Sequence, residues 1–202
     1  MQFAVMTGHE CTWDRVLVSL VDITARKKAE AYLEYLGKHD SLTRLRNRVF
    51  YVEELNRVSR KGPWPLSILA MDLNGLKKIN DAEGHAAGDA MLRRTGEVLT
   101  NATAGYPYCV ARIGGDEFVV IVSGRADSAV LLAIADRIIA RVSQPISFDG
   151  ADCRVSASVG IVRTVDMVNP DPARILAAAD RALYAAKHAG RSRAVLLPAP
   201  LE

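Results

Sequence analysis

The chain has 202 residues, of which 50% are hydrophobic and 24% charged, and its formal net charge is +3. This composition is typical of one sizeable soluble domain with a short appendage, and no apolar run approaches the roughly 18 residues that a membrane-spanning helix needs. Because the 26 basic and 23 acidic residues are well mixed along the chain, we expect neither nucleic acid nor a membrane among its partners.

The N-terminal segment differs in pattern from the remainder. A β-rich run ends at Thr24, a candidate helix cap, and residues 26–38 follow with apolar side chains at helical spacing. Because a strand and a charged helix are too little for a domain, we expect residues 1–25 to be the end of a domain that continues upstream. The alternative is an additional strand or a disordered leader.

Residues 39–198 are predicted to form one α/β domain, because helical and strand patterns alternate there. Helices are expected at about residues 47–60, 86–101, 126–142 and 172–189, and strands at residues 65–74, 108–113, 118–122 and 154–162. A tight Gly-Gly-Asp-Glu turn joins the second and third of these strands into a hairpin. The sheet must therefore be mixed.

Three acidic residues are candidates for a metal site. Asp116 and Glu117 stand in the turn after the two glycines, and Asp72 lies near the end of the strand over residues 65–74. If that strand neighbours the hairpin, the three side chains converge at one end of the sheet. Clustered carboxylates repel each other unless a cation neutralises them, and their oxygens are the ligands that Mg²⁺ takes. A polar hairpin tip with solvated acids would also fit this pattern.

The stretch that follows Asp72 contains candidates for reading a base. Asn80 and Asp89 flank glycine-containing turns at Gly84 and Gly88. Guanine presents N1–H and its amino group side by side, and one carboxylate accepts both, whereas adenine lacks this pair of donors. Asp89 would therefore favour guanine. In the alternative interpretation Asp89 only starts the next helix, where acids are favourable.

Three basic residues are candidates for binding an anion. Lys187 lies in the last turn of the predicted C-terminal helix and Arg191 just beyond it, so both are within reach of one anionic ligand. Lys77 follows the strand of Asp72 and is a candidate for contacting phosphates. The alternatives are a solvated charge for Lys77 and a favourable interaction with the helix dipole for the other two.

Taken together, these stretches resemble the GGDEF family of diguanylate cyclases. The motif that names the family stands intact at residues 114–118. The further matching motifs occur in the family's order at residues 40–48, 72–89, 158–161 and 185–192. The likeness covers about residues 38–197, and several motifs in the right order are more specific than any single one.

The resemblance implies metal ligands and catalytic residues. Asp72, the Leu73 carbonyl, Asp116 and Glu117 would form the metal centre. Asp116 and Glu117 would be the catalytic pair, with Glu117 assisting at the metal or at the attacking hydroxyl. Two divalent ions, Mg²⁺ or Mn²⁺, would serve each active site.

The resemblance also implies how the substrate binds. Asn80 and Asp89 would read the guanine, with His85 close to the nucleotide. The triphosphate would be bound by main-chain amides after Leu73, including that of Leu76, and by the side chains of Lys77, Lys187 and Arg191.

The activity that the resemblance implies is the condensation of two GTP molecules into cyclic di-GMP, with release of two pyrophosphates. One domain would hold one GTP, so two copies would have to face each other and a homodimer would be required. The implied fold is a palm-like nucleotidyl cyclase domain, in which helices flank a central five-stranded mixed sheet.

The N-terminal segment is similar to the closing strand and exit motif of a PAS sensor domain. Residues 1–25 would be the end of that sensor, which acts in cis, and residues 26–38 would be a signalling helix that pairs with its twin. Three cysteines without metal-ligand spacing predict reduced thiols in a cytoplasmic chain. A membrane anchor of the full-length protein would then lie further upstream.

Four departures from the family pattern stand out. Arg44 occupies a position where glycine is usual, Asn74 one where a second aspartate is common, and Ser192 one where asparagine is more usual. The stretch Gly-Tyr-Pro-Tyr at residues 105–108 replaces the Arg-x-x-Asp product-inhibition site of many members. We therefore expect this chain to lack that site.

Two other functions compete with this interpretation. A degenerate domain would bind GTP without turning it over, but such domains usually lose the acidic turn or the equivalent of Asp72. An enzyme that makes a different cyclic nucleotide is disfavoured by Asp89, which favours guanine over adenine.

Overall fold

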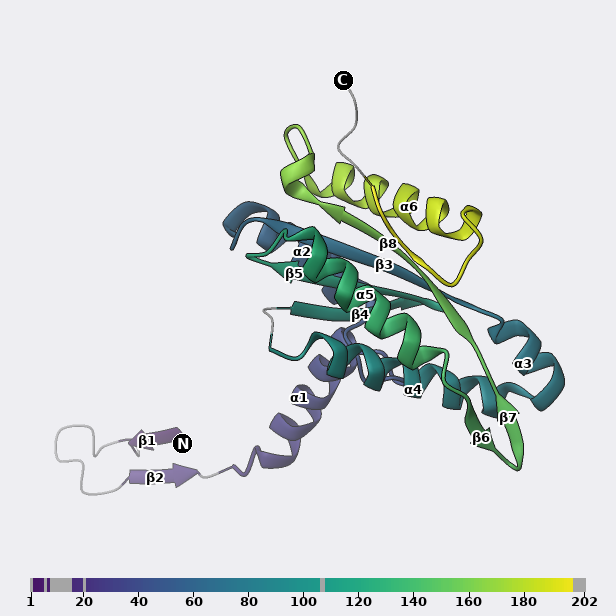
Figure 1. Cartoon of the computed structure of the whole chain (residues 1–202). Coiled ribbons are helices and arrows are strands. Elements are labelled where there is room, and N and C mark those ends of the chain that lie inside the picture. Colours follow the sequence, from purple (N-terminus) through teal and green to yellow (C-terminus); the bar gives the residue numbers. More distant parts are fainter. Residues whose placement is uncertain (1, 6, 8–15, 20, 106–107, 198–202) are drawn as a thin grey trace. The chain divides into compact units, whose positions relative to one another are not determined.

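The computed structural model describes residues 2–5, 7, 16–19, 21–105 and 108–197. The chain divides into two compact units, Met1–Leu36 and Gly37–Glu202, and each is described by itself (Figure 1). Within the described ranges, no helix is long and apolar enough to cross a membrane.

The first unit contains a strand pair and most of one helix. Strand β1 (Gln2–Val5) pairs antiparallel with β2 (Val16–Ser19), and helix α1 (Thr24–Lys38) follows. The predicted helix is confirmed, but the predicted cap is wrong because Thr24 is itself the first helical residue. Its N–H donates to the Asp22 carboxylate over 2.8 Å. No residue of α1 is buried.

The second unit is built on a five-stranded sheet in the order β4-β5-β3-β8-β9. The strands are β3 (Leu66–Asn74), β4 (Tyr108–Gly114), β5 (Glu117–Ser123), β8 (Ser156–Arg163) and β9 (Ala194–Leu196). Strand β9 runs parallel to β8 and every other pairing is antiparallel. The expected mixed five-stranded sheet is therefore confirmed, and so is the hairpin of β4 and β5.

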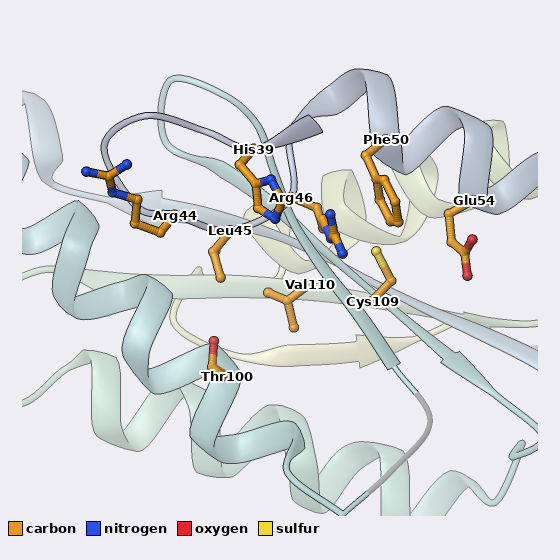
Figure 2. A pocket seen from close by; sticks show the side chains of 9 residues that line it. All are labelled: His39, Arg44, Leu45, Arg46, Phe50, Glu54, Thr100, Cys109 and Val110. Atoms are coloured by element: carbon orange, nitrogen blue, oxygen red, sulfur yellow. The ribbon is translucent and has the colours of Figure 1, made fainter. Parts of the chain in front are cut away.

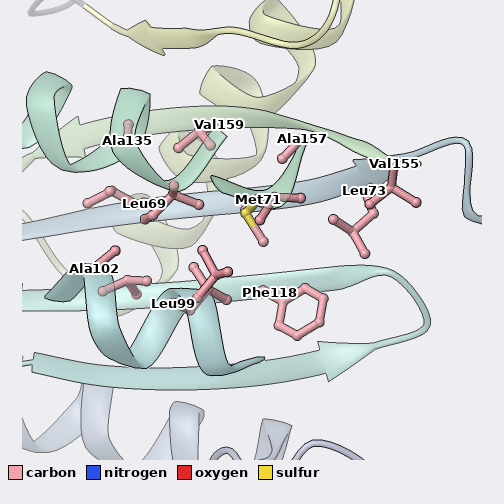
Figure 3. Close-up of a cluster of buried hydrophobic side chains, with 14 of the residues drawn as sticks. Leu69, Met71, Leu73, Leu99, Ala102, Phe118, Ala135, Val155, Ala157 and Val159 are labelled. Atoms are coloured by element: carbon pink, nitrogen blue, oxygen red, sulfur yellow. The ribbon is translucent and has the colours of Figure 1, made fainter. Parts of the chain in front are cut away.

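Helices cover both faces of this sheet. Helices α4 (His85–Thr103) and α5 (Ser128–Val142) pack on one face, over a core that includes Leu69, Met71 and Phe118 (Figure 3). Helices α2 (Arg48–Lys61) and α6 (Pro172–His188) pack on the other, against Ile68 and Ala70. Because side chains alternate along a strand, Asp72 shares the α2 and α6 face with Ile68 and Ala70.

Five elements were not predicted from the sequence: α3, β6, β7, β9 and a 3₁₀ turn. Helix α3 (Leu76–Glu83) was not predicted, and the glycines at its two ends, Gly75 and Gly84, both have positive φ. The hairpin of β6 (Ile146–Phe148) and β7 (Ala151–Cys153) turns at Asp149-Gly150, a pair typical of tight hairpins. Strand β9 is short and gave no pattern of its own. A 3₁₀ turn, η1 (Thr164–Asp166), follows β8.

Gly160 of β8 allows helix α6 to approach the sheet closely. A Cβ atom at this position would lie 2.1 Å from the backbone nitrogen of Leu183 and 2.3 Å from the carbonyl carbon of Ala182, both in α6. These are main-chain atoms, so neither can move without moving the helix. Glycine inside a strand commonly marks such an approach.

We therefore expect Gly160→Ala to lower the free energy of unfolding by about 2–3 kcal/mol, because α6 must shift away from β8. The matched control is Gly37→Ala, where an added Cβ meets nothing within 4 Å. Urea unfolding of both variants measures the difference. Equal stability of the two would show that the sheet and α6 can separate at little cost.

Candidate active site

Two acidic side chains face each other where β3 ends and β5 begins. The antiparallel register places Asp72 directly opposite Glu117. Opposite residues of such a pair have Cβ atoms about 4.5–5.5 Å apart. Asp72 is 9% exposed, whereas Glu117 is exposed and Asp116 half-buried. The Leu73 N–H donates to the Asp116 carbonyl over 3.1 Å, so the turn is fixed to the end of β3.

The turn before Glu117 depends on a glycine and on an arginine. Gly115 has φ +47°, a left-handed conformation that L side chains rarely adopt. The Arg112 guanidinium donates to the Gly115 carbonyl through Nε (2.9 Å) and one terminal nitrogen (2.7 Å). Its other terminal nitrogen pairs with Asp40 at 3.2 Å. Arg112 therefore joins the acidic turn to the loop before α2.

That loop is organised around the Asp40 carboxylate. It accepts hydrogen bonds from the backbone N–H and the hydroxyl of Thr43, at 2.8 and 2.7 Å. Burial by itself raises the pKa of Asp40, but the Thr43 hydrogen bonds and the charge of Arg112 outweigh it, and the pKa lies below its ordinary value. Arg44, in the same loop, has φ +63°. This left-handed backbone explains why glycine is the usual residue there.

Lys187 reaches the acidic end of the sheet from the last turn of α6. Its ammonium nitrogen lies 2.6 Å from Oδ2 of Asp72. The Asp72 side chain is 12% exposed and that of Lys187 34%. The Asp72 carboxylate is nearly buried and therefore needs a counter-charge. The Lys187 ammonium, on a partly accessible side chain, supplies it.

The residues at this end of the sheet suit a divalent ion by their chemistry. They supply carboxylate and carbonyl oxygens, which are the ligands that Mg²⁺ prefers, and an ammonium already stands beside Asp72 as a cation would. However, no three histidine, cysteine, aspartate or glutamate side chains in the described ranges are gathered closely enough to hold a metal ion. Asp72 and Glu117 are nevertheless cross-strand neighbours, and Asp116 adjoins Glu117 in the turn.

Asn80 of α3 packs against the start of α4 at Gly88. A Cβ atom at Gly88 would lie 1.9 Å from Oδ1 of Asn80, so only glycine leaves room for this side chain. Oδ1 of Asn80 is buried and has no hydrogen-bond partner within the described residues. A buried amide oxygen without a partner is costly, and it is a ready acceptor for a ligand donor.

The other predicted binding residues lie around α3 and α4 or beyond α6. Asp89 follows Gly88 directly and is half-buried, with an Arg93 nitrogen 4.0 Å from its carboxylate. Leu76 is buried as the first residue of α3. The side chains of Lys77, His85 and Arg191 are exposed.

Two of the departures from the family pattern make specific contacts. The Asn74 amide donates to the Ser158 hydroxyl on β8 over 3.1 Å. The Ser192 hydroxyl donates to the Ser156 hydroxyl over 2.8 Å. Both substitutions therefore attach their segments to strand β8 close to the acidic end of the sheet.

A cavity of about 510 Å³ opens beside the acidic residues, between α2 and α6. Its lining includes both Glu117 and Lys187. The remaining lining residues are Arg48, Tyr51, Val52, Ile113, Leu176, Asp180, Leu183 and Tyr184. Tyr184 is 63% exposed and stacks on His188 with 3.8 Å between ring centroids. The cavity gives a bound molecule access to Glu117 from solvent.

A second cavity, of about 280 Å³, lies beside β4. Figure 2 shows Phe50 and Glu54 projecting from α2 toward Cys109 of β4, with Arg46 nearby. The Arg46 guanidinium lies 4.1 Å from the centroid of the Phe50 ring. Burial, with a smaller contribution from the charge of Glu54, raises the pKa of the Cys109 thiol to about 11. The thiol is therefore protonated and unreactive at neutral pH.

Sequence reasoning missed three features of this region. The Asp40–Arg112 pair and the Lys187–Asp72 pair join residues far apart in the chain, and no local pattern predicts them. Gly88 carried a usable signal, because glycine inside a helix is unfavourable relative to alanine and often has a packing reason.

The Asp40–Arg112 pair should make stability depend on pH. Since the pKa of Asp40 is lower in the folded chain than its ordinary value of 3.8, the stabilisation is complete above about pH 5 and is lost as the pH falls through the folded pKa. We expect Asp40→Asn to lower the free energy of unfolding by about 1–2 kcal/mol near neutral pH.

The gap between this variant and the wild type should close as the pH falls toward about 3. Urea unfolding over this pH range measures it, with Asp81→Asn, an exposed acid of α3, as the control. A gap that stays constant with pH would contradict the role given to the Asp40 carboxylate.

Comparisons with family models, with curated proteins and with solved structures all indicate the same family. The model of the diguanylate cyclase GGDEF domain matches residues 37–193. The chain is 36% identical, over 87% of its length, to an uncharacterized signaling protein of Caulobacter vibrioides, of which it covers 22%. It is 38% identical, over 80% of its length, to diguanylate cyclase TpbB of Pseudomonas aeruginosa, of which it covers 38%. The chain thus spans less than two fifths of either relative.

Two solved structures share the fold. The coiled coil and GGDEF domain of DgcB from Caulobacter crescentus, in complex with c-di-GMP, matches with a TM-score of 0.79 at 25% identity and covers 87% of this chain and 93% of that one. The GGDEF domain of TpbB from Pseudomonas aeruginosa matches with a TM-score of 0.71 at 38% identity and covers 78% of this chain and 93% of that one. With the family's motif intact in the β4–β5 turn and its model matched over residues 37–193, the chain belongs to the diguanylate cyclase GGDEF-domain family.

Proposed function

We propose that this chain condenses two GTP molecules into cyclic di-GMP and releases two pyrophosphates. One observation carries the proposal: a nearly buried aspartate, Asp72, stands opposite Glu117 of an intact Gly-Gly-Asp-Glu-Phe turn, and Glu117 lines a cavity together with Lys187. Relatives named diguanylate cyclase and a structural relative solved with c-di-GMP support it.

The guanine would be read by Asn80 and Asp89. The unpartnered Oδ1 of Asn80 supports this assignment, because it is an acceptor for a guanine N–H. The Asp89 carboxylate would accept the paired N1–H and amino donors, which adenine lacks. His85, the first residue of α4, would lie close to the nucleotide.

The triphosphate would be held by main-chain amides at the start of α3, including that of Leu76, and by Lys77, Lys187 and Arg191. Gly75, with φ +95°, turns the chain between β3 and α3, so the first N–H groups of the helix are available to an anion. The three positively charged side chains would stabilise the negative charge that develops on the phosphate oxygens as the bond to pyrophosphate breaks.

Asp72, Asp116, Glu117 and the Leu73 carbonyl would hold two divalent ions, Mg²⁺ or Mn²⁺. Bound there, such ions lower the proton affinity of the ribose 3′-hydroxyl and stabilise the entering and leaving oxygens. In each of two successive steps, the 3′-oxygen of one GTP forms a bond to the α-phosphorus of the other and the bond to pyrophosphate breaks. Glu117, exposed toward the cavity, would face the attacking hydroxyl.

Each chain would supply one GTP, so catalysis would need two copies facing each other. We also propose that residues 39–198 are the catalytic domain, residues 26–38 a signalling helix, and residues 1–25 the end of a PAS-like sensor acting in cis. The exposed apolar side chains of α1, Tyr32 and Leu33 among them, support pairing of this helix with its twin.

The direct test is incubation of the purified chain with GTP and Mg²⁺, followed by chromatographic separation of the nucleotides. We expect cyclic di-GMP from GTP and no corresponding product from ATP. Asp72→Asn and Asp116→Asn should reduce turnover at least about a hundredfold, because each removes charge from the metal centre. The matched control Asp81→Asn, on the exposed face of α3, should leave turnover unchanged.

Turnover that appears only after a coiled coil is fused to the chain would indicate a competent domain that does not dimerise unaided. Bound GTP with no product, even in the fused protein, would instead favour a binding module. The same assay with added cyclic di-GMP tests the expectation that the chain lacks the product-inhibition site. Strong inhibition by cyclic di-GMP would contradict it. Of that stretch, Tyr106 and Pro107 lie outside the described residues.

Gly88→Ala should weaken GTP binding without unfolding the chain. The added methyl group would occupy the position of Oδ1 of Asn80, so the Asn80 side chain must turn away and lose its hydrogen bond to the base. We expect the KM for GTP to rise about tenfold. Gly96→Ala in the same helix is the matched control, because its Cβ would make only ordinary contacts of 3.4–3.5 Å. An equal KM in both variants would refute the role given to Asn80.

A further inference from the structure

The ion pair between Lys187 and Asp72 joins two residues to which the proposed function gives different partners. Asp72 is assigned to a divalent ion and Lys187 to the triphosphate. In the nucleotide-free chain the two instead contact each other, with 2.6 Å between the ammonium nitrogen and Oδ2. One of the two assigned partners must therefore displace this contact.

The Asp72 carboxylate needs a positive neighbour at all times. Its side chain is 12% exposed, and an unpaired charge with so little access to water is strongly unfavourable. Within the described part of the chain, Lys187 is the cationic side chain found within 4.0 Å of it. The ammonium thus neutralises Asp72 when nothing else does.

A divalent ion and the Lys187 ammonium cannot use Oδ2 of Asp72 together without repulsion. Like charges a few ångströms apart repel strongly where solvent is limited. Lys187 can leave, because its side chain is long and flexible, is 34% exposed, and also lines the cavity of Glu117 and Tyr184. A triphosphate bound there would give the ammonium a new partner.

We propose that Lys187 is a resident counter-ion that occupies Asp72 until metal and nucleotide arrive together, and then transfers to the triphosphate. This inference rests on the proposed function for the assignment of the metal to Asp72. Lys187 therefore disfavours binding of a divalent ion to the empty site and couples metal loading to nucleotide loading. By thermodynamic linkage, each of the two ligands then raises the affinity for the other.

The first test measures Mn²⁺ binding to the full chain without nucleotide, by the electron paramagnetic resonance signal of free Mn²⁺. Lys187→Gln removes the competing ammonium and should bind Mn²⁺ about tenfold more tightly than the wild type, the factor expected for loss of one charged hydrogen bond. The matched control Lys78→Gln removes the same charge from an exposed position of α3 and should bind as the wild type does. Equal affinity of the two variants would overturn the proposal.

The second test repeats the titration with 3′-deoxy-GTP, which lacks the attacking hydroxyl and is not turned over. The Mn²⁺ that this nucleotide binds in solution is subtracted with a protein-free titration. In the wild type the nucleotide should raise the affinity for Mn²⁺ about tenfold more than it does in Lys187→Gln. The same enhancement in both proteins would also overturn the proposal.

These outcomes separate the inference from the function on which it rests. If, with 3′-deoxy-GTP present, the wild type binds no more Mn²⁺ than Asp72→Asn does, the proposed metal site itself fails. If the wild type binds Mn²⁺ with nucleotide through Asp72 but Lys187→Gln shows no gain without it, only the counter-ion role fails. Circular dichroism of each variant verifies that it is folded. If the ion pair were purely structural, Lys187→Gln would lower the stability of the chain and leave its affinity for Mn²⁺ unchanged.

Discussion

The antiparallel register of β3 and β5 is the constraint on which the acidic site depends. It places Met71 opposite Phe118 in the core and Asp72 opposite Glu117 on the other face. A shift of one residue would exchange the two faces of a strand, burying a carboxylate among the core side chains of α4 and α5. The hydrophobic alternation that stabilises the sheet therefore also fixes which face the carboxylates occupy.

Charge pairing supports this arrangement from two sides. Arg112 connects the acidic turn to Asp40 and so restrains the tip of the hairpin. Lys187 neutralises Asp72 from α6, and α6 can reach β8 closely because Gly160 has no side chain. The helix that brings the cation is thus positioned by a packing feature of the sheet.

Local patterns in the sequence predicted most of the elements of the second unit. The glycine turn between β4 and β5 is a local signal and occurs as expected. Helix α2 begins one residue after the predicted start at Asn47, which caps it. Helix α3 was missed because Gly84, at its end, indicates a turn. Strand β9 was missed because its pairing with β8 joins segments about 35 residues apart. The pairs Lys187–Asp72 and Asp40–Arg112 follow from tertiary packing alone, so the candidate site was predicted as a set of residues and not as a set of contacts.

The central claim is that Asp72 and Asp116 hold the metal for a GTP whose base is read by Asn80 and Asp89. A crystal structure of the chain with Mn²⁺ and 3′-deoxy-GTP tests it most directly. We predict anomalous density for Mn²⁺ beside both carboxylates, the guanine edge on Asn80 and Asp89, and the Lys187 ammonium on the phosphates. Manganese bound away from Asp72 and Asp116, or the base bound elsewhere, would contradict the account.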